Sequence, residues 1–222
     1  MISLTQLRKS FGSHHVRKGI DLTFEKGKIY GLVGANGAGK TTLFRCIAGL
    51  EEYSGTITSS EAPLKNHLGL LQAEPFFFSR MTGREYIQLL CNARQKNIDR
   101  IDTHNMFELP LDQYVSTYST GMKKKLALTA ILLQDNPYII LDEPFNGVDI
   151  QSNILLIDLI NDLRNQGKCV LISSHIFSTL SDTCDEIHLL QNGHITSSTT
   201  KPGFSSLEEL LRQKAEVWIL KD

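Results

Sequence analysis

The sequence has no long apolar run. Hydrophobic residues make up 41% of its 222 residues, yet no stretch approaches the roughly 20 consecutive apolar residues that a membrane-spanning helix needs. The N-terminal segment Met1–Gln6 also lacks the basic and then apolar regions of a secretory signal peptide. We therefore expect the chain to be cytoplasmic.

An excess of charge of one sign is missing as well. The chain has 23 Lys and Arg against 24 Asp and Glu, which gives a formal net charge of −1. Proteins that bind nucleic-acid phosphates usually carry a basic excess. We therefore expect no nucleic acid among the partners of this chain.

Cysteine is scarce, and its spacing indicates no site. The four cysteines lie far apart and form no Cys-x-x-Cys pair. This spacing favours small buried thiols over a disulfide framework or a zinc site. The four residues are Cys46, Cys91, Cys169 and Cys184.

What the chain does have is a regular alternation of strand and helix patterns. Short apolar runs rich in β-branched residues are separated by segments with helical periodicity, which predicts an α/β fold with a mainly parallel sheet and helices packed on it. Strands are expected at Lys28–Val33, Tyr138–Leu141, Lys168–Ser173 and Glu186–Leu190, and helices at Lys40–Gly49, Gly121–Gln134 and Asp149–Gln166.

Two segments depart from this alternation. Polar and apolar residues alternate over Ile2–Glu25, which suits an antiparallel N-terminal β-subdomain. From Gln72 to Ser119 the pattern is helical, as at Gly83–Asn97, and contains no convincing strand. We expect a single domain over 1–222, with a core at about 1–74 and 130–222 and an inserted helical subdomain at about 75–129.

Two further elements are expected near the C-terminus. Asn192-Gly193 lies between two short apolar runs, and this dipeptide is typical of a tight β-hairpin turn. Ser205–Lys214 has a helical pattern and is followed by the short apolar run Val217–Leu220. We expect the hairpin at the edge of the sheet and a helix after it.

A glycine-rich segment between the first core strand and the first helix fits the pattern G-x-x-x-x-G-K-[ST]. Its glycines allow backbone N–H groups to converge on phosphates, and the following helix offers its positive end. Lys40 would reach the β- and γ-phosphates of ATP, and the Thr41 hydroxyl would hold Mg²⁺. The predicted ATP-binding residues are Gly34, Ala35, Asn36, Gly37, Ala38, Gly39, Lys40, Thr41 and Thr42.

Two carboxylates follow a second buried strand. The apolar run Tyr138–Leu141 delivers Asp142 at its C-terminal end, where parallel sheets place their ligands, so Asp142 can accept from a water on Mg²⁺. Glu143 would then lie beside the γ-phosphate, suited to polarise the attacking water. A solvated acid before a turn is the alternative for Glu143.

Together these residues resemble the ABC transporter ATPase family over essentially the whole chain. Gln72 is similar to the Q-loop glutamine, which contacts Mg²⁺ and couples to membrane subunits. Tyr118–Met122 stands where the family signature Leu-Ser-Gly-Gly-Gln is found. Asn146–Asp149 resembles the D-loop, His175 the switch histidine, and Phe11 the aromatic residue that stacks on adenine.

The resemblance implies a site shared between two copies. In the family the signature faces the ATP of the other subunit, so each nucleotide would lie between Lys40 of one copy and Ser119 and Gly121 of the next. It also places Asp149 among the nucleotide-binding residues. The expected assembly is a homodimer, or a pseudo-dimer with a paralogous subunit, around two ATP molecules.

The signature departs from the commonest family pattern at three positions, which are Tyr118, Thr120 and Met122. Similar Tyr-Ser-x-Gly-Met-Lys variants occur among bacterial drug, antibiotic-peptide and sodium export ATPases. The resemblance therefore implies an exporter ATPase on the cytoplasmic face of the cell membrane, with a separately encoded permease. The alternatives are a soluble ABC ATPase without a transport role and a nucleotide-binding regulator that does not turn over.

Two clusters of like residues have more than one interpretation. Phe76-Phe77-Phe78 follows Gln72 and is either an exposed patch for the permease or the contact of the helical subdomain with the core. Lys123-Lys124-Lys125 is predicted to be a solvated helix face.

Overall fold

A computed structural model describes residues 1–9 and 19–219 of the chain. Its centre is a six-stranded sheet with the strand order β5-β6-β7-β3-β8-β9. The strands β5 to β8 in this order run parallel, and only β9 is antiparallel, paired with β8. The bounds are β3 Ile29–Val33, β5 Leu68–Leu71, β6 Tyr138–Asp142, β7 Cys169–Ser174, β8 Glu186–Gln191 and β9 His194–Thr200.

A second sheet confirms the predicted antiparallel β-subdomain. It has the order β2-β1-β4 and is antiparallel throughout, with β1 at Ile2–Arg8, β2 at Ile20–Phe24 and β4 at Ser54–Ser59. The sequence did not indicate β4 because this edge strand has no buried side chain, so it lacks an apolar pattern. It did not indicate β5 because that strand has only four residues, one of them glycine.

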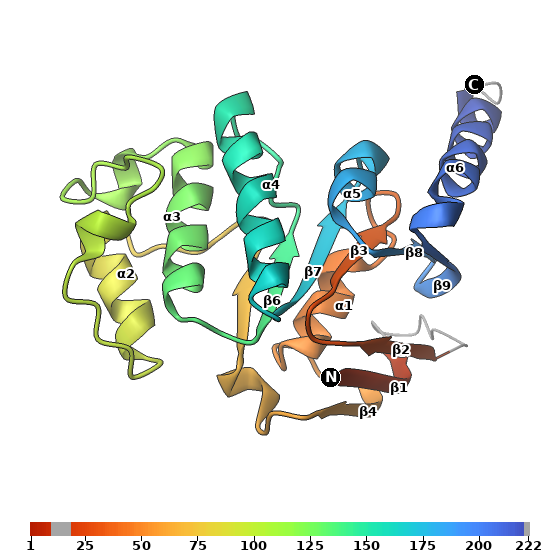
Figure 1. The fold of residues 1–222 in the computed structure, drawn as a ribbon, viewed down its shortest axis with the longest axis horizontal. Coiled ribbons are helices and arrows are strands. Elements are labelled where there is room, and N and C mark those ends of the chain that lie inside the picture. The colour runs from red at the N-terminus through yellow and green to blue at the C-terminus, as the bar shows by residue number, and fades with distance from the viewer. Residues whose placement is uncertain (10–18, 220–222) are drawn as a thin grey trace.

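Helices cover both faces of the central sheet (Figure 1). In Figure 1, α3, α4 and α5 lie over one face, while α1 and the antiparallel sheet lie on the other. The bounds are α1 Lys40–Ile47, α2 Gly83–Asn92, α3 Thr120–Leu133, α4 Ile150–Asn165, α5 Phe177–Thr183 and α6 Phe204–Ile219. Short 3₁₀ turns occur at Leu64–Asn66, Ile101–His104, Val115–Thr117 and Lys201–Gly203.

Strand β6 shows how the two faces are filled. Ile139 and Leu141 belong to the hydrophobic cluster that includes α3, α4 and α5, whereas Tyr138 and Ile140 belong to the cluster with α1 and the antiparallel sheet. Every residue of β6 is buried. Because both faces are covered, this strand is an uninterrupted apolar run in the sequence, with no polar alternation.

The segment between β5 and α3 is helical, as expected. Helix α2 begins with a capping box, in which the Thr82 hydroxyl accepts from Glu85 N and the Glu85 carboxylate accepts from Thr82 N. Within the described part of 75–129, the one β contact is an isolated bridge between Thr82 and Tyr114. The exact domain boundaries remain a prediction.

Smaller differences from the sequence concern helix ends. Helix α2 ends at Asn92, five residues before the predicted Asn97, and α6 continues to Ile219, past the predicted end at Lys214. The β8–β9 hairpin at Asn192-Gly193 is confirmed. All four cysteines are free and buried, as predicted.

A buried histidine makes the stability of this fold depend on pH. The His188 ring stacks on Tyr30 with centroids 5.9 Å apart, and its Nδ1 pairs with the Ser198 hydroxyl at 2.8 Å. Its Nε2 is buried without a hydrogen-bond partner among the described residues. Burial lowers the pKa of His188 to about 4, so the folded chain keeps the ring neutral where the unfolded chain binds a proton.

We expect the free energy of unfolding to fall by about 2 kcal/mol between pH 7 and pH 5 because of this residue alone. The loss begins near the unfolded pKa of about 6.5 and ends near the folded value of about 4. Urea unfolding at both pH values should show a smaller pH dependence in His188→Phe. The exposed His104 provides the matched control, since His104→Gln should keep the wild-type dependence. An equal dependence in all three proteins would contradict the prediction.

Candidate active site

The strand register brings the predicted site residues to one edge of the sheet. Asp142 lies beside Ser173 on β7, and Val33, the last residue of β3, lies beside Ser174. The carboxyl ends of parallel strands are where α/β folds place their ligands. The residues that end or follow these strands are Gln72 after β5, Asp142 and Glu143 at β6, His175 after β7 and Gly34 after β3.

The glycine-rich loop is held against the hairpin at the sheet edge. A Cβ on Gly34 would lie 2.4 Å from the carbonyl oxygen of Leu190, so only glycine fits where the β8 backbone passes. Gly193 N of the hairpin donates to Ala38 O at 3.1 Å. The loop therefore packs against the central sheet before α1 begins at Lys40.

The first two residues of α1 link this loop to the end of β6. Lys40 is only 7% exposed, and its Nζ donates to Gly34 O at 2.7 Å and lies 3.4 Å from Glu143 Oε1. The Thr41 hydroxyl donates to Asp142 Oδ2 at 2.7 Å. The Lys40 ammonium group and the oxygen atoms of Thr41 and Asp142 thus lie close together at the start of α1.

A serine that sequence reasoning missed connects the two carboxylates. The Ser173 hydroxyl donates to Asp142 Oδ1 and accepts from Glu143 N at 2.9 Å. It therefore orients the Asp142 side chain and the Glu143 backbone together. The signal available in the sequence was a polar residue at the C-terminal end of a buried apolar strand.

The Glu143 carboxylate is held from two sides. Its Oε2 lies 2.9 Å from His175 Nδ1, and its Oε1 faces Lys40 Nζ. The carboxylate side of this contact accepts, so Nδ1 of His175 carries the proton. The backbone of Glu143 is left-handed, with φ at +49°, an uncommon conformation for a residue with a side chain.

The second group of predicted residues lies at the starts of α3 and α4. Ser119 caps α3 through a hydrogen bond from Met122 N at 3.2 Å, and Asp149 caps α4 through one from Ser152 N at 2.9 Å. A Cβ on Gly121 would lie 2.7 Å from Gly147 O, so glycine is needed where α3 meets the loop before α4.

The structure therefore brings together the predicted residues at the start of α1 and the ends of β6 and β7. The predicted residues at the starts of α3 and α4 form a separate group. Lys40, Thr41, Asp142, Glu143 and His175 contact one another directly or through a shared partner. Among the hydrogen bonds of the described residues, none joins Ser119, Gly121 or Asp149 to the loop Gly34–Thr42. Phe11 lies outside the described residues, and its predicted role remains a prediction.

Comparison with known proteins decides the family. Residues 17–146, more than half of the chain, match the family model described as ABC transporter. The chain belongs to the ABC transporter family. It is the ATP-binding subunit of such a transporter and an ATPase.

Relatives of this ABC subunit include two bacterial transport proteins. The ABC transporter ATP-binding protein NatA of Bacillus subtilis is 32% identical, with 88% of this chain and 87% of the relative covered. The lantibiotic transport ATP-binding protein SrtF of Streptococcus pyogenes is 27% identical, with 96% and 97% covered. A solved dimeric ATP-binding cassette with bound ADP and phosphate shares the fold, with a TM-score of 0.81, 16% identity, and 90% of this chain and 99% of that chain covered.

One prediction about this ABC subunit is wrong. Lys124 was expected on a solvated helix face, but it is only 4% exposed, and its Nζ donates to the carbonyl oxygens of Glu143 and Asn146. Lys125 Nζ lies 2.6 Å from Asp149 Oδ2. The reason is that α3 packs with this face on the loop that follows β6, a contact that no local pattern reveals.

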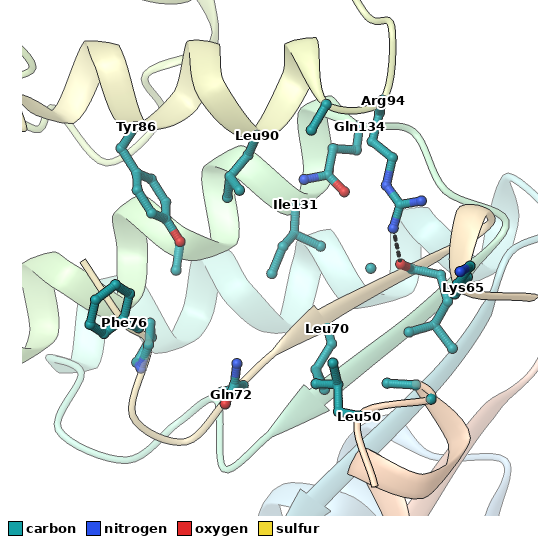
Figure 2. Close-up of a pocket in the computed structure, with 17 residues that line it drawn as sticks. Leu50, Lys65, Leu70, Gln72, Phe76, Tyr86, Leu90, Arg94, Ile131 and Gln134 are labelled. Atoms are coloured by element: carbon teal, nitrogen blue, oxygen red, sulfur yellow. Dashed lines mark hydrogen bonds between the residues drawn. The ribbon is translucent and has the colours of Figure 1, made fainter. Parts of the chain in front are cut away.

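The predicted Q-loop residue lies in a groove of the ABC subunit, shown in Figure 2. Gln72 Oε1 accepts from Arg45 Nη1 at 3.4 Å, and the residue lines a groove of about 480 Å³ with side chains from β5, α2 and α3. Phe76 lines the same groove and is 71% exposed, and Phe78 is 54% exposed. Phe77 instead packs on Tyr86, with ring centroids 4.5 Å apart. Phe76 and Phe78 are thus exposed and Phe77 is packed, and the contact with a permease stays a prediction.

No helix in the part of the chain that the structure describes is long and apolar enough to cross a bilayer.

Proposed function

We propose that this ABC subunit binds ATP on the loop Gly34–Thr42 and hydrolyses it with Glu143 as the residue that activates water. The observation that carries the proposal is the Glu143 carboxylate, held between Lys40 and His175 at the end of β6. Such a carboxylate is aligned before substrate arrives, which is what phosphoryl transfer requires of a protein.

The residues at the start of α1 fit a magnesium ion. Mg²⁺ prefers hard oxygen ligands and usually keeps several of its waters. The Thr41 hydroxyl and the Asp142 carboxylate offer such oxygens 2.7 Å apart, next to the phosphate loop. When bound, the ion would neutralise charge on the β- and γ-phosphates. Gln72, which follows the strand next to β6, is proposed as a further contact.

The proposed reaction uses each residue in a separate role. Lys40 contacts the β- and γ-phosphates, and Glu143 orients and polarises a water against the γ-phosphorus. The new P–O bond forms as the bond from the γ-phosphorus to the bridging oxygen breaks, which releases ADP and phosphate. His175, hydrogen-bonded to Glu143, is positioned to sense the γ-phosphate.

We further propose that the site is completed by a second copy or by a paralogous subunit. Ser119 and Gly121 begin α3 and offer a hydroxyl and a positive helix end to a phosphate. Among the hydrogen bonds and ion pairs of the described residues, none joins these two residues or Asp149 to the loop Gly34–Thr42 of the same chain. The ATP-binding cassette with the same fold is described as dimeric, which supports an assembly of two subunits.

The proposed physiological role is export through a separately encoded permease, at the cytoplasmic face of the membrane. The relative SrtF is named for lantibiotic transport, and Tyr118 and Met122 match the Tyr-Ser-x-Gly-Met-Lys variant of the signature that resembles export ATPases. ATP-driven closure of the dimer would move the permease between its states.

The groove beside Gln72 is the proposed docking site for a short permease helix. Leu50, Leu70, Leu90 and Phe76 give it apolar walls, and Lys65 and Arg94 lie together at one end (Figure 2). None of its lining residues is acidic. An amphipathic helix with an acidic residue at the matching end would complement both features.

Changing two exposed groove residues should uncouple the chain from its membrane partner. In Phe76→Ser with Lys65→Glu we expect recovery of an integral membrane protein by affinity purification from membranes to fall at least about tenfold, because an apolar and a charge contact are lost. ATP hydrolysis by the purified chain should stay within about twofold, since neither residue is among the hydrogen-bond or ion-pair partners given above for Glu143.

The matched control is Tyr114→Ser, which alters an exposed aromatic residue of the helical segment outside the groove. It should retain the partner. An equal loss in this control would argue against the groove, and failure of the wild-type chain to recover any membrane protein would argue against the transport role itself.

A further inference from the structure

The most unusual charged residue outside the catalytic edge is Lys124. It lies on α3 and is almost completely buried, although burying an ammonium group is costly unless it is hydrogen-bonded. Its Nζ donates to Glu143 O and Asn146 O, each at 2.8 Å. Two backbone carbonyl oxygens therefore accept hydrogen bonds from this buried ammonium group.

The two carbonyls belong to the segment that carries the catalytic carboxylate. Glu143 is left-handed, a backbone conformation that is unfavourable for a residue with a side chain. A peptide in that conformation needs support from its surroundings. Ser173 supports the N–H side of Glu143, and Lys124 supports the carbonyl side.

Two further contacts tie the same helix to the same loop. The start of α3 packs so closely that a Cβ on Gly121 would lie 2.7 Å from Gly147 O. Lys125 Nζ pairs with Asp149 Oδ2 at 2.6 Å. Helix α3, which presents Ser119 at its first turn, is therefore joined at three points to the loop from Glu143 to Asp149.

We propose that Lys124 is a positioning residue, which couples the orientation of α3 to the placement of the Glu143 carboxylate. A shift of α3, when Ser119 engages a nucleotide on another copy, moves the carbonyl of Glu143 through Lys124. The carboxylate of the same chain is then aligned or misaligned with its own water. This role rests on the proposed function of Glu143.

The test compares kinetic constants of purified variants with MgATP as substrate. Lys124→Met removes the donor but keeps the length and burial of the side chain, and its kcat should fall about tenfold with KM within about twofold. Lys124→Gln can still donate to one carbonyl and should lose only about threefold in kcat. The neighbouring, more exposed Lys123 provides the matched control, Lys123→Met, with wild-type constants.

A double-mutant cycle gives the readout that a purely structural role would not produce. If Lys124 acts through Glu143, adding Lys124→Met to Glu143→Gln should lower the residual single-turnover rate by less than about twofold. An undiminished effect in that background would overturn the proposal.

Three other results would also overturn it. The first is an unchanged kcat in Lys124→Met. The second is a fall in ATP affinity by the same factor as kcat, or an unfolding temperature lowered enough to account for the fall in kcat. The third is an equal effect of Lys123→Met. If Lys124→Met does not fold, the same criteria apply to Lys124→Gln. Should Glu143→Gln hydrolyse ATP normally, the proposed function fails instead, which a separate measurement on that variant shows.

Discussion

Replacing Glu143 with glutamine is expected to lower the rate of ATP hydrolysis by roughly 10²–10⁴-fold, the usual contribution of a positioned acid–base residue. Glutamine keeps the shape of the side chain and can still accept from His175 Nδ1. It loses the negative charge that faces Lys40 and can no longer polarise water. ATP binding should survive, because the loop Gly34–Thr42 and Thr41 are unchanged.

The same variant should accumulate the ATP-bound dimer, since the step that releases it is blocked. Single-turnover hydrolysis and size-exclusion chromatography with MgATP measure the two effects. Glu52→Gln, a change at an exposed carboxylate away from the catalytic edge, should behave as wild type in both. Normal turnover in Glu143→Gln would rule out the role proposed for this residue.

Mixing two inactive variants is expected to restore hydrolysis if each site is built from two copies. Lys40→Met removes the cation of the phosphate loop. Ser119→Asp keeps a helix cap, since aspartate also caps, but places a negative charge where a phosphate should bind. Each variant alone should lose at least about a hundredfold in rate. A mixed dimer contains one intact site, made of Lys40 from one copy and Ser119 from the other.

With random pairing, an equal mixture should recover up to about a quarter of the wild-type rate, because half of the dimers are mixed and each has one good site. The control mixture is Lys40→Met with Glu143→Gln. These two residues lie 3.4 Å apart in one chain, so their defects affect separate sites in a mixed dimer and leave neither intact. Recovery in the control, or none in the test mixture, would speak against a shared site.

The parts of the site that could be predicted are those whose chemistry is local. The phosphate loop needs glycines, a lysine and a hydroxyl in a fixed order, and the strand before it is recognisable from its apolar residues alone. Asp142 and Glu143 could be placed because a buried parallel strand delivers whatever follows it to one sheet edge. The strand register places His175 and Gln72 directly after strands that end at the same edge.

Lys124 shows why other parts could not be predicted. In the sequence it stands between two lysines, and helical periodicity does not tell which of the three is buried. Only the packing of α3 on the loop after β6 decides that Lys124 points inward to two carbonyls. Strand β4 was missed for the corresponding reason, since its pairing with β1 depends on backbone contacts and not on an apolar pattern.

The sequence by itself determined that this chain is an α/β protein with an ATP-binding loop, because phosphate binding depends on residues that are neighbours along the chain, and the order of its motifs added the resemblance to the ABC family. The tertiary structure alone decided how Glu143 is held. Its supports, Ser173 and Lys124, come from β7 and α3, and they meet the end of β6 only when the sheet and its helical layer pack together. Contacts between segments that are distant in the sequence leave no local sequence pattern, so they can be identified only in the folded structure.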